Sequence, residues 1–376
     1  MPGVWKRTSG LPDLQQQKGQ KTHVSLYLLQ QGGAWANRQG CRRCVILQRL
    51  CRNQLQKLRP LMKKTLQIGT RGSQLALWQA NWVKTALEVR DSSLSIELVI
   101  IKTTGDKILD VPLARVGGKG LFVKEIEEAL LNEKIDLAVH SMKDMPAQIP
   151  QGLCIGAIPQ REVPQDVLIS KSNRLFSELP SGAIIGTGSL RRKAQVLFAR
   201  PDLVVLPLRG NIDTRLKKLE SENLDAIILA AAGVRRLGFE NRITQYLDEN
   251  IMLPAVGQGA LCIEIRQDDP LTGPVVAGLE DPTTRAVIRG ERAFLDRLEG
   301  GCQVPIAAHG RIDNNIFTLS GLVAALDGKT LIKQTLQGPE NSSDVIGAEL
   351  AERLISMGAK TIIDNLKADI DLNHER

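Results

Sequence analysis

Short apolar stretches alternate with amphipathic ones from Thr65 to the C-terminus, and this alternation constrains the fold more than any other feature. The stretch 95–102 is rich in β-branched residues, as strands are, whereas the apolar residues of 75–89 recur at helical spacing. Strands that alternate with helices predict sheets with helices packed on their faces. We therefore expect an α/β fold.

Two short sequences resemble each other in the two halves of this region. Ile68-Gly-Thr-Arg-Gly-Ser73 and Ile185-Gly-Thr-Gly-Ser189 both place glycines and a hydroxyl between a strand end and a helix start. Coincidence could explain so short an echo, but two similar lobes that face a shared cleft would explain it too. The domains that we expect are a basic, disordered extension over 1–64, a first lobe over 65–160 and 260–278, a second lobe over 165–255, and a smaller C-terminal α/β domain over 282–376.

The net charge of +8 belongs to the N-terminal extension rather than to the folded body. Residues 1–61 hold 11 Lys and Arg but a single acid, Asp13, so the rest of the chain holds 38 of the 49 bases and 40 of the 41 acids. That remainder is close to −2, which argues against a nucleic-acid partner. The extension is Arg-rich and acid-poor like an organellar targeting segment, although it has few serines. We prefer a second interpretation, in which it is upstream sequence that the fold does not need, because Met62 directly precedes the first strand.

The cysteines indicate a reducing compartment, and we expect a cytoplasmic protein. Cys41 and Cys44 form a CxxC pair with no second ligand pair, which is a weak zinc signal. Cys154 and Cys262 lie in apolar strands and are expected to be small core residues. Cys302 differs, because it lies in a Gly-Gly-Cys-Gln-Val-Pro loop. No apolar run approaches the roughly 20 residues that span a bilayer, so we expect no membrane helix.

The glycine-rich loops do not fit the known nucleotide motifs. Val116-Gly-Gly-Lys-Gly120 lacks the hydroxyl residue and the spacing of a P-loop, and Gly186-Thr-Gly188 lacks the third glycine of a dinucleotide fingerprint. Four scattered histidines predict no metal site, and His140 is expected to be a packed residue at a strand end.

Cations and hydroxyls recur instead where strands end and helices begin. Open α/β sheets bind ligands outside the carboxyl ends of their strands, and helix N-termini favour anions. A single arginine in such a position is more often a solvated surface charge, but the repetition favours a cleft for a polyanion, and arginine suits carboxylates and phosphates alike. The residues in these positions are Arg71, Ser73, Thr187, Ser189, Arg191, Arg192, Arg209, Arg215 and Arg236.

Asp144 is the one acid among these bases, directly after Lys143 at a strand end. An acid beside bases is usually a structural ion pair. The functional alternative is a carboxylate that stabilises a positive charge or moves a proton.

Several long motifs, all in consistent order, resemble the porphobilinogen deaminase family. They include Ala138-Val-His-Ser-Met-Lys-Asp144, Gly188-Ser-Leu-Arg-Arg192 and Leu298-Glu-Gly-Gly-Cys-Gln-Val-Pro305. The other matching runs are 70–79, 116–125, 208–211 and 253–260. The resemblance extends from about Leu66 to the C-terminus and excludes the segment before Met62.

The resemblance implies the role of each matching residue. It implies that Cys302 holds a dipyrromethane cofactor through a thioether and that Asp144 is the catalytic carboxylate near the pyrrole nitrogens. It adds Lys119 and Lys143 to the nine residues above as ligands for the carboxylates of cofactor and substrate. Arg115 departs from the family pattern, since many members have lysine there, but the charge is the same. No metal is implied.

The implied activity is that of a transferase which deaminates four porphobilinogen molecules and condenses them into the linear tetrapyrrole hydroxymethylbilane, for porphyrin and haem biosynthesis. The resemblance further implies two lobes like those of periplasmic binding proteins, and we expect a monomer that binds neither nucleic acid nor membrane. The alternative is a bilobal binding protein for an anionic ligand, without catalysis, because a fold does not decide a function. Such a protein would bind its ligand reversibly and carry no covalent chromophore.

Overall fold

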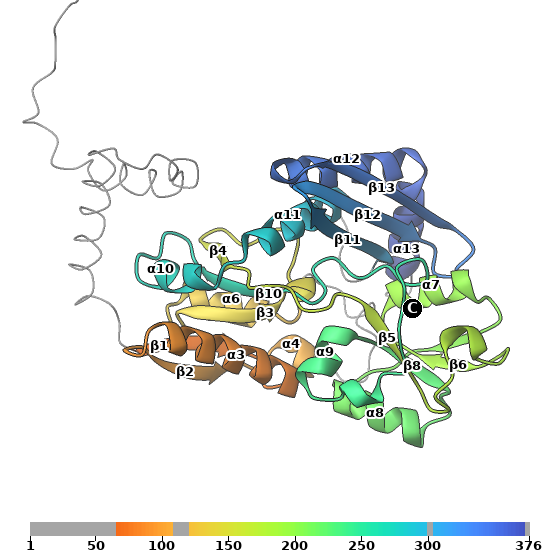
Figure 1. Ribbon diagram of the computed structural model, residues 1–376, viewed down its shortest axis with the longest axis horizontal. Helices are drawn as coiled ribbons and strands as arrows, with labels where there is room; N and C mark the ends of the chain where they lie inside the picture. The colour runs from red at the N-terminus through yellow and green to blue at the C-terminus, as the bar shows by residue number, and fades with distance from the viewer. Residues whose placement is uncertain (1–64, 108–119, 299–303, 373–376) are drawn as a thin grey trace, which may run out of the picture. The chain divides into compact units, whose positions relative to one another are not determined.

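The computed structural model describes residues 65–107, 120–298 and 304–372, and for 369–372 the backbone alone. The chain divides by its contacts into two units, Met1–Met62 and Lys63–Arg376, and the described residues all belong to the second (Figure 1). They form a mixed α/β structure with three sheets, which confirms the expected fold class. No helix in this part of the chain is both long and apolar enough to span a bilayer.

The first lobe is a five-stranded sheet in the order β2-β1-β3-β10-β4. Strands β1, β2 and β3 are parallel, whereas β10 runs antiparallel between β3 and β4. Strand β10 therefore brings a late segment of the chain back into the first sheet. The elements of this lobe are β1 (Thr65–Thr70), α3 (Gln74–Arg90), β2 (Ser95–Ile100), α4 (Thr104–Lys107), α6 (Lys124–Leu131), β3 (Leu137–Ser141), β4 (Leu153–Ala157), β10 (Leu261–Arg266) and α10 (Thr272–Val276).

The second lobe has the same arrangement of parallel and antiparallel strands, in the order β7-β6-β8-β5-β9. Here β6, β7 and β8 are parallel and β5 is the antiparallel strand, in the place that β10 takes in the first lobe. The short echo in the sequence thus marks equivalent strand ends, after β1 and after β6. The elements are β5 (Asp166–Ser170), β6 (Ile184–Gly186), α7 (Leu190–Ala199), β7 (Val204–Leu206), α8 (Ile212–Ser221), β8 (Ala226–Ala230), α9 (Ala231–Arg236) and β9 (Gln245–Tyr246).

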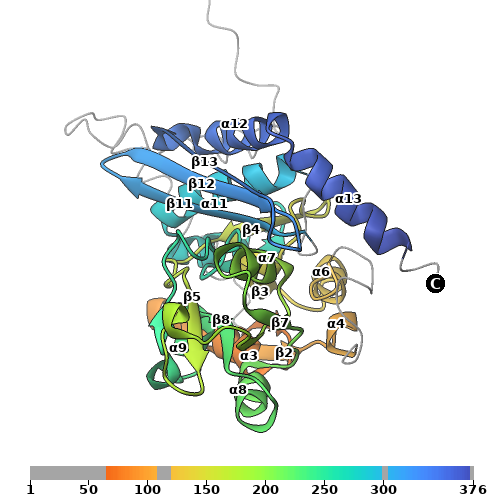
Figure 2. The same ribbon diagram turned by 90° about the vertical axis from the view of Figure 1, so that its right-hand side faces the viewer.

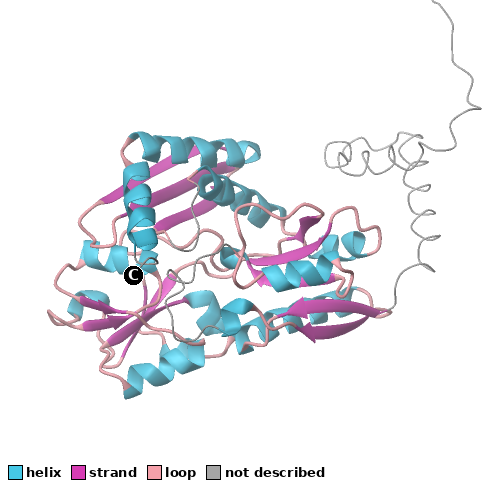
Figure 3. Cartoon of the chain, turned by 180° about the vertical axis from the view of Figure 1, so that it is seen from behind, coloured by secondary structure: helices cyan, strands magenta, loops and turns pink. Residues whose placement is uncertain are grey.

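The C-terminal region is an antiparallel sheet of β11 (Ile306–Asp313), β12 (Ile316–Ala324) and β13 (Leu331–Pro339) with three helices. Helices α11 (Pro282–Arg297), α12 (Ser343–Ser356) and α13 (Ala359–Leu372) pack against it, and α12 runs along the sheet (Figure 2). Phe294, Phe317 and Leu350 are fully buried between these layers. Ala194 of α7 packs with Leu322 and Ala324 of β12, so this region also contacts the second lobe (Figure 3).

Candidate functional site

The first-lobe cation Arg71 lies where β1 ends and α3 begins. Ser73 caps α3, because its side chain accepts a hydrogen bond from the Ala76 amide. Arg71 donates from Nε to Asp106 at 3.1 Å, and its guanidinium lies 4.1 Å from the centre of the Phe122 ring. Burial would raise the pKa of Asp106, but the hydrogen bond and charge of Arg71 lower it below its ordinary value. The position of Arg71 is therefore fixed by a charged partner and an aromatic face.

Asp144 lies in a tight turn at the end of β3, over residues 142–144. Gln79 of α3 donates to Ser141 Oγ at 2.9 Å, and the Met142 amide donates to the Ala260 carbonyl at 3.0 Å. Gly257 has a φ of +70°, and a Cβ there would lie 2.6 Å from Met142 Cγ. The segment before β10 therefore holds the turn closely from one side.

Lys143, beside Asp144, is near the charged groups of the second lobe. Burial lowers the pKa of Lys143 to about 8, although Asp144 and Asp166 oppose the shift, and the positive charges of Arg192 and Arg191 lower it further. The end of β3 in the first lobe and the start of α7 in the second therefore share one electrostatic environment.

In the second lobe, hydroxyls organise the start of α7 as Ser73 does in the first. Ser189 caps the helix, since its Oγ accepts from the Arg192 amide at 3.4 Å. Thr187 is buried, and its Oγ1 accepts from the Ser189 amide at 3.2 Å. The equivalent strand ends of the two lobes thus use the same local chemistry.

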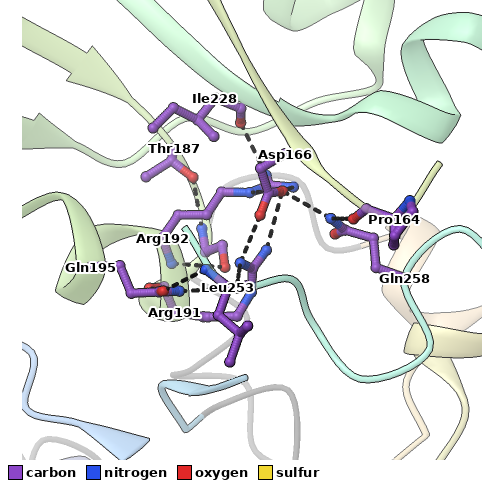
Figure 4. Close-up of polar contacts among 10 residues, drawn as sticks. Pro164, Asp166, Thr187, Arg191, Arg192, Gln195, Ile228, Leu253 and Gln258 are labelled. Carbon is purple, nitrogen blue, oxygen red and sulfur yellow. Dashed lines mark hydrogen bonds and ion pairs between the residues drawn. The ribbon is translucent and has the colours of Figure 1, made fainter. Parts of the chain in front are cut away.

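Arg191 and Arg192 surround Asp166, a carboxylate that the sequence reasoning missed (Figure 4). Arg191 donates to Oδ2 at 2.7 Å, Arg192 Nε donates to Oδ1 at 2.9 Å, and all three side chains are buried. Gln258 adds a hydrogen bond to Oδ1 at 3.0 Å. The sequence does not indicate that Asp166 pairs with these arginines, because Asp166 has the pattern of an ordinary polar residue at the start of an apolar strand.

The same two arginines also bind main-chain carbonyls. Arg191 donates to Leu253 O at 2.7 Å, and Arg192 donates to Ile228 O at 3.0 Å. Burial would raise the pKa of Asp166, but the two guanidinium charges outweigh it and hold the pKa at about 2. With one carboxylate against two guanidinium groups, the cluster keeps a net positive charge.

Arg209, Arg215 and Arg236 are half-buried. Burial is the main cause that lowers the pKa of Arg215 and of Arg236 to about 10, and it also lowers that of Arg209. The charges of Arg192 and Arg209 lower the pKa of Arg215 further. Arg192, Arg209 and Arg215 are therefore neighbours.

Arg215 and Arg236 form no ion pair with a carboxylate of the described residues. Arg215 donates to Gly210 O at 2.7 Å, and Arg236 donates to Gly259 O at 2.8 Å. Arg236 also lies 5.6 Å from the Trp78 ring of the first lobe. Desolvated cations that form no ion pair are costly, and an anionic ligand would offset that cost. The arrangement therefore fits a molecule that carries several carboxylates.

Some of the predicted site residues lie outside the described part of the chain. These are Lys119 and Cys302, together with Arg115 and the whole extension over 1–64. Within the described residues, no group of three or more His, Cys, Asp and Glu side chains could hold a metal ion.

Family models match almost all of the second unit. Residues 66–273 match the model "Porphobilinogen deaminase, dipyromethane cofactor binding domain", and residues 286–356 match "Porphobilinogen deaminase, C-terminal domain". The porphobilinogen deaminase of Pelobacter propionicus is 54% identical over 303 residues, which cover 81% of this chain and 97% of that protein. That of Geobacter metallireducens is 56% identical over 300 residues, covering 80% and 94%.

The chain belongs to the porphobilinogen deaminase family. The resemblance found in the sequence motifs is thereby confirmed, and with it the enzyme class, a porphobilinogen deaminase, also called hydroxymethylbilane synthase. The family model names dipyrromethane as the cofactor of residues 66–273.

Solved structures of binding proteins resemble part of the chain at low sequence identity. The methionine-binding protein MetQ covers 57% of this chain and 89% of its own, with a TM-score of 0.37 and 12% identity. An arginine-specific binding protein of Salmonella typhimurium covers 59% and 94%, with a TM-score of 0.35 and 14% identity. The two lobes are established here by the two matching sheets rather than by this distant likeness.

Asp166→Asn tests the buried ion-pair cluster. Removing the carboxylate charge leaves two buried guanidinium groups without a counter-charge, so we expect a loss of about 3 to 5 kcal/mol in the free energy of unfolding. Urea unfolding at neutral pH measures this loss. The control is Asp202→Asn, which removes a more exposed partner of Arg200 and should change stability little.

The pH dependence of the same variant provides a second measurement. The pKa of Asp166 is lowered to about 2 in the folded chain, so its contribution is present above about pH 4 and lost as the pH falls toward 2. Asp166→Asn should lack this part of the acid destabilisation. Equal acid sensitivity in both proteins, together with unchanged stability at neutral pH, would contradict the account.

Proposed function

We propose that Asp144, Cys302 and the surrounding cations carry out the family reaction in this chain, on dipyrromethane attached covalently through Cys302. In that reaction, four porphobilinogen molecules lose ammonia and condense into hydroxymethylbilane. The supporting observation is that Arg215 of α8 and Arg236 of α9 are half-buried and form no ion pair with a described carboxylate. Arg215 also lies near Arg192 of the Asp166 cluster, which in turn acts on Lys143 beside Asp144. When bound, dipyrromethane supplies the free pyrrole position on which the new chain grows.

The chemistry of the residues fits such a group. Each porphobilinogen unit carries an acetate and a propionate, so cofactor and growing chain together present many carboxylates. Planar guanidinium groups bind carboxylates through paired hydrogen bonds, and hydroxyls and helix N-termini add donors. The proposed ligands are Arg71, Ser73, Lys119, Lys143, Thr187, Ser189, Arg191, Arg192, Arg209, Arg215 and Arg236.

Arg191 and Arg192 contribute to this binding in a different way from Arg215. Their guanidinium groups already donate hydrogen bonds inside the protein, to the Asp166 carboxylate and to the carbonyls of Leu253 and Ile228. We assign them an electrostatic role, because the surplus positive charge of their cluster attracts carboxylates at short range in a medium of low polarity. They also fix the helix start on which Ser189 lies.

Asp144 acts on the substrate ring. Positive charge develops at the pyrrole nitrogen when ammonia leaves, and a fixed carboxylate close to that nitrogen stabilises it and accepts the N–H hydrogen bond. The turn that holds Asp144 is fixed by Gln79, Ala260 and Gly257, so the carboxylate needs little reorganisation.

We further propose that the second unit comprises the three domains expected from the sequence, with boundaries near 160, 260 and 282. The matching sheets of the two lobes and the separate C-terminal sheet support this division. We propose a cytoplasmic monomer without a nucleic-acid partner, in keeping with the near-neutral charge of residues 62–376.

Asp144→Ala tests the catalytic assignment. The variant should fold with unchanged stability but lose turnover of porphobilinogen by roughly 10³-fold, because an electrostatic contribution to the transition state is removed. Steady-state kinetics and thermal unfolding measure the two effects. Asp313→Ala, an exposed acid, serves as the control. A preserved rate with reduced stability would make Asp144 a structural ion-pair partner instead.

Arg215→Leu separates a ligand-binding cation from a structural one. Because Arg215 makes no ion pair within the described residues, its removal should leave the free energy of unfolding unchanged or higher. Turnover should fall by at least roughly tenfold, because bound carboxylates lose a partner. Lys217→Leu, an exposed position on the same helix, is the control. Normal turnover in Arg215→Leu would contradict the proposed carboxylate site.

A further inference from the structure

Three ionisable side chains lie buried in the first lobe, on α6 and on the two paired strands that adjoin the turn with Asp144. They are Glu127 of α6, His140 of β3 and Glu264 of β10, and each is less than a tenth exposed. His140 Nε2 lies 3.1 Å from Glu264 Oε2, and the two side chains are 4% and 0% exposed. The sequence analysis expected His140 to be only a packed residue, and the family reaction as described above assigns none of the three a role.

Both carboxyl groups in this cluster have an oxygen without a hydrogen-bond partner. Glu127 Oε1 and Glu264 Oε1 are buried and unpaired among the described residues. An ionised carboxylate with an unpaired oxygen is costly to bury, and two of them near one another are costlier still. His140 contacts Glu264 and leaves Glu127 without a direct partner, so a proton on Glu127 lowers the cost of burying it.

The other charged groups near the cluster act on Glu264 or on partners of their own rather than on Glu127. The strands packed against α6 bring Cys154 on β4, and Cys262 and Arg266 on β10. Arg266 donates to the carbonyls of Leu130 and Ile135 and to Asp269, and it pairs with Asp136. The positive charge of Arg292 of α11 acts on Glu264, and its hydrogen bonds go to the carbonyls of Pro146 and Ala147.

The pKa of Glu127 agrees with this arrangement, in which neither His140 nor Arg292 pairs with Glu127 directly. Burial is the largest cause that raises the pKa of Glu127 to about 7, and the negative charge of Glu264 raises it further, whereas His140 opposes the shift. Near neutral pH, Glu127 is therefore at the point where it gains or loses a proton.

We propose that Glu127, His140 and Glu264 form a buried proton-holding cluster that positions the Asp144 turn. In this cluster His140 contacts Glu264 directly, and Glu127 carries a proton below its raised pKa. His140 directly precedes Ser141, and the Ala260 carbonyl that anchors Met142 directly precedes β10, which carries Glu264. The two strands that hold the cluster therefore also hold the turn.

Loss of the Glu127 proton places a second negative charge beside Glu264 and weakens the packing of α6 on β3 and β10. The pKa of Glu127 is raised in the folded chain, so its effect on stability has the opposite sign to that of Asp166. The contribution of Glu127 to stability is fully present below about pH 4.5 and is lost as the pH rises through about 7. All three residues act as positioning residues, because they affect turnover only by holding the turn that carries Asp144. This part of the inference rests on the role proposed for Asp144.

Glu127→Gln, which imitates the protonated form, is compared with Glu128→Gln, an exposed neighbour on the same helix. Infrared spectroscopy of the purified proteins follows the C=O band of a protonated carboxyl group across the pH range. We expect a band in the wild type that disappears near pH 7, persists in Glu128→Gln and is absent from Glu127→Gln. In Glu264→Gln the band should disappear at lower pH, because the neighbouring negative charge is gone.

The kinetic arm measures kcat and KM of the same proteins against pH. One unit above the pKa of Glu127, wild-type kcat should fall roughly tenfold relative to Glu127→Gln, with KM unchanged. Lys143 also titrates in this range, but it does so in every variant and cancels from the comparison.

Two results would overturn the inference. A band that survives in Glu127→Gln would mean that the proton lies elsewhere. If the spectra are as expected but kcat depends on pH identically in Glu127→Gln and in the wild type, the positioning role is excluded. The spectral titration needs no substrate, so it remains decisive even if Asp144 proves not to be catalytic.

Discussion

The buried ion pair between Asp166 and the two arginines of α7 is the interaction on which the site depends most. Asp166 begins the antiparallel strand of the second lobe, Arg191 and Arg192 begin the helix after β6, and Gln258 lies just before the strand that returns to the first lobe. One carboxylate thereby joins three segments that are far apart in the sequence. A buried charge that loses its partner costs several kcal/mol, so these segments are strongly constrained to meet.

The surplus of positive charge around that pair gives the site its chemical character. Carboxylates about 4 Å apart repel one another by on the order of 4 kcal/mol at an effective dielectric constant near 20, and a growing pyrrole chain accumulates them. Arg215 and Arg236 are already desolvated and positioned in the folded chain. The desolvation of these two cations therefore takes place during folding, and bound carboxylates offset part of its free-energy cost.

The sequence predicted the alternating architecture and the ends of strands where the cations gather, because these follow from local periodicity and from glycines. The similar sequences at Ile68 and Ile185 left coincidence and paired lobes as alternatives, and the two sheets have the same arrangement of parallel and antiparallel strands. It could not predict Asp166 as the partner of Arg191, because nothing local links positions 25 residues apart in different elements. Glu127 and Glu264 were missed for the same reason, since each reads as an ordinary charge in its own segment. The ligand roles of the cations and of Cys302 remain predictions.

The intact mass of the purified protein tests the central claim, an anchored cofactor among fixed cations, most directly. Burial raises the thiol pKa of Cys154 and of Cys262, which keeps both unreactive, so Cys302 is the cysteine after Met62 that we expect to be modified. The mass should exceed that of the sequence by two condensed pyrrole units. The added group should remain attached after denaturation and treatment with thiol reductants, and it should map to the peptide that contains Cys302. Cys302→Ser should lack the addition and be inactive. An unmodified Cys302 in a fully active protein would contradict the account.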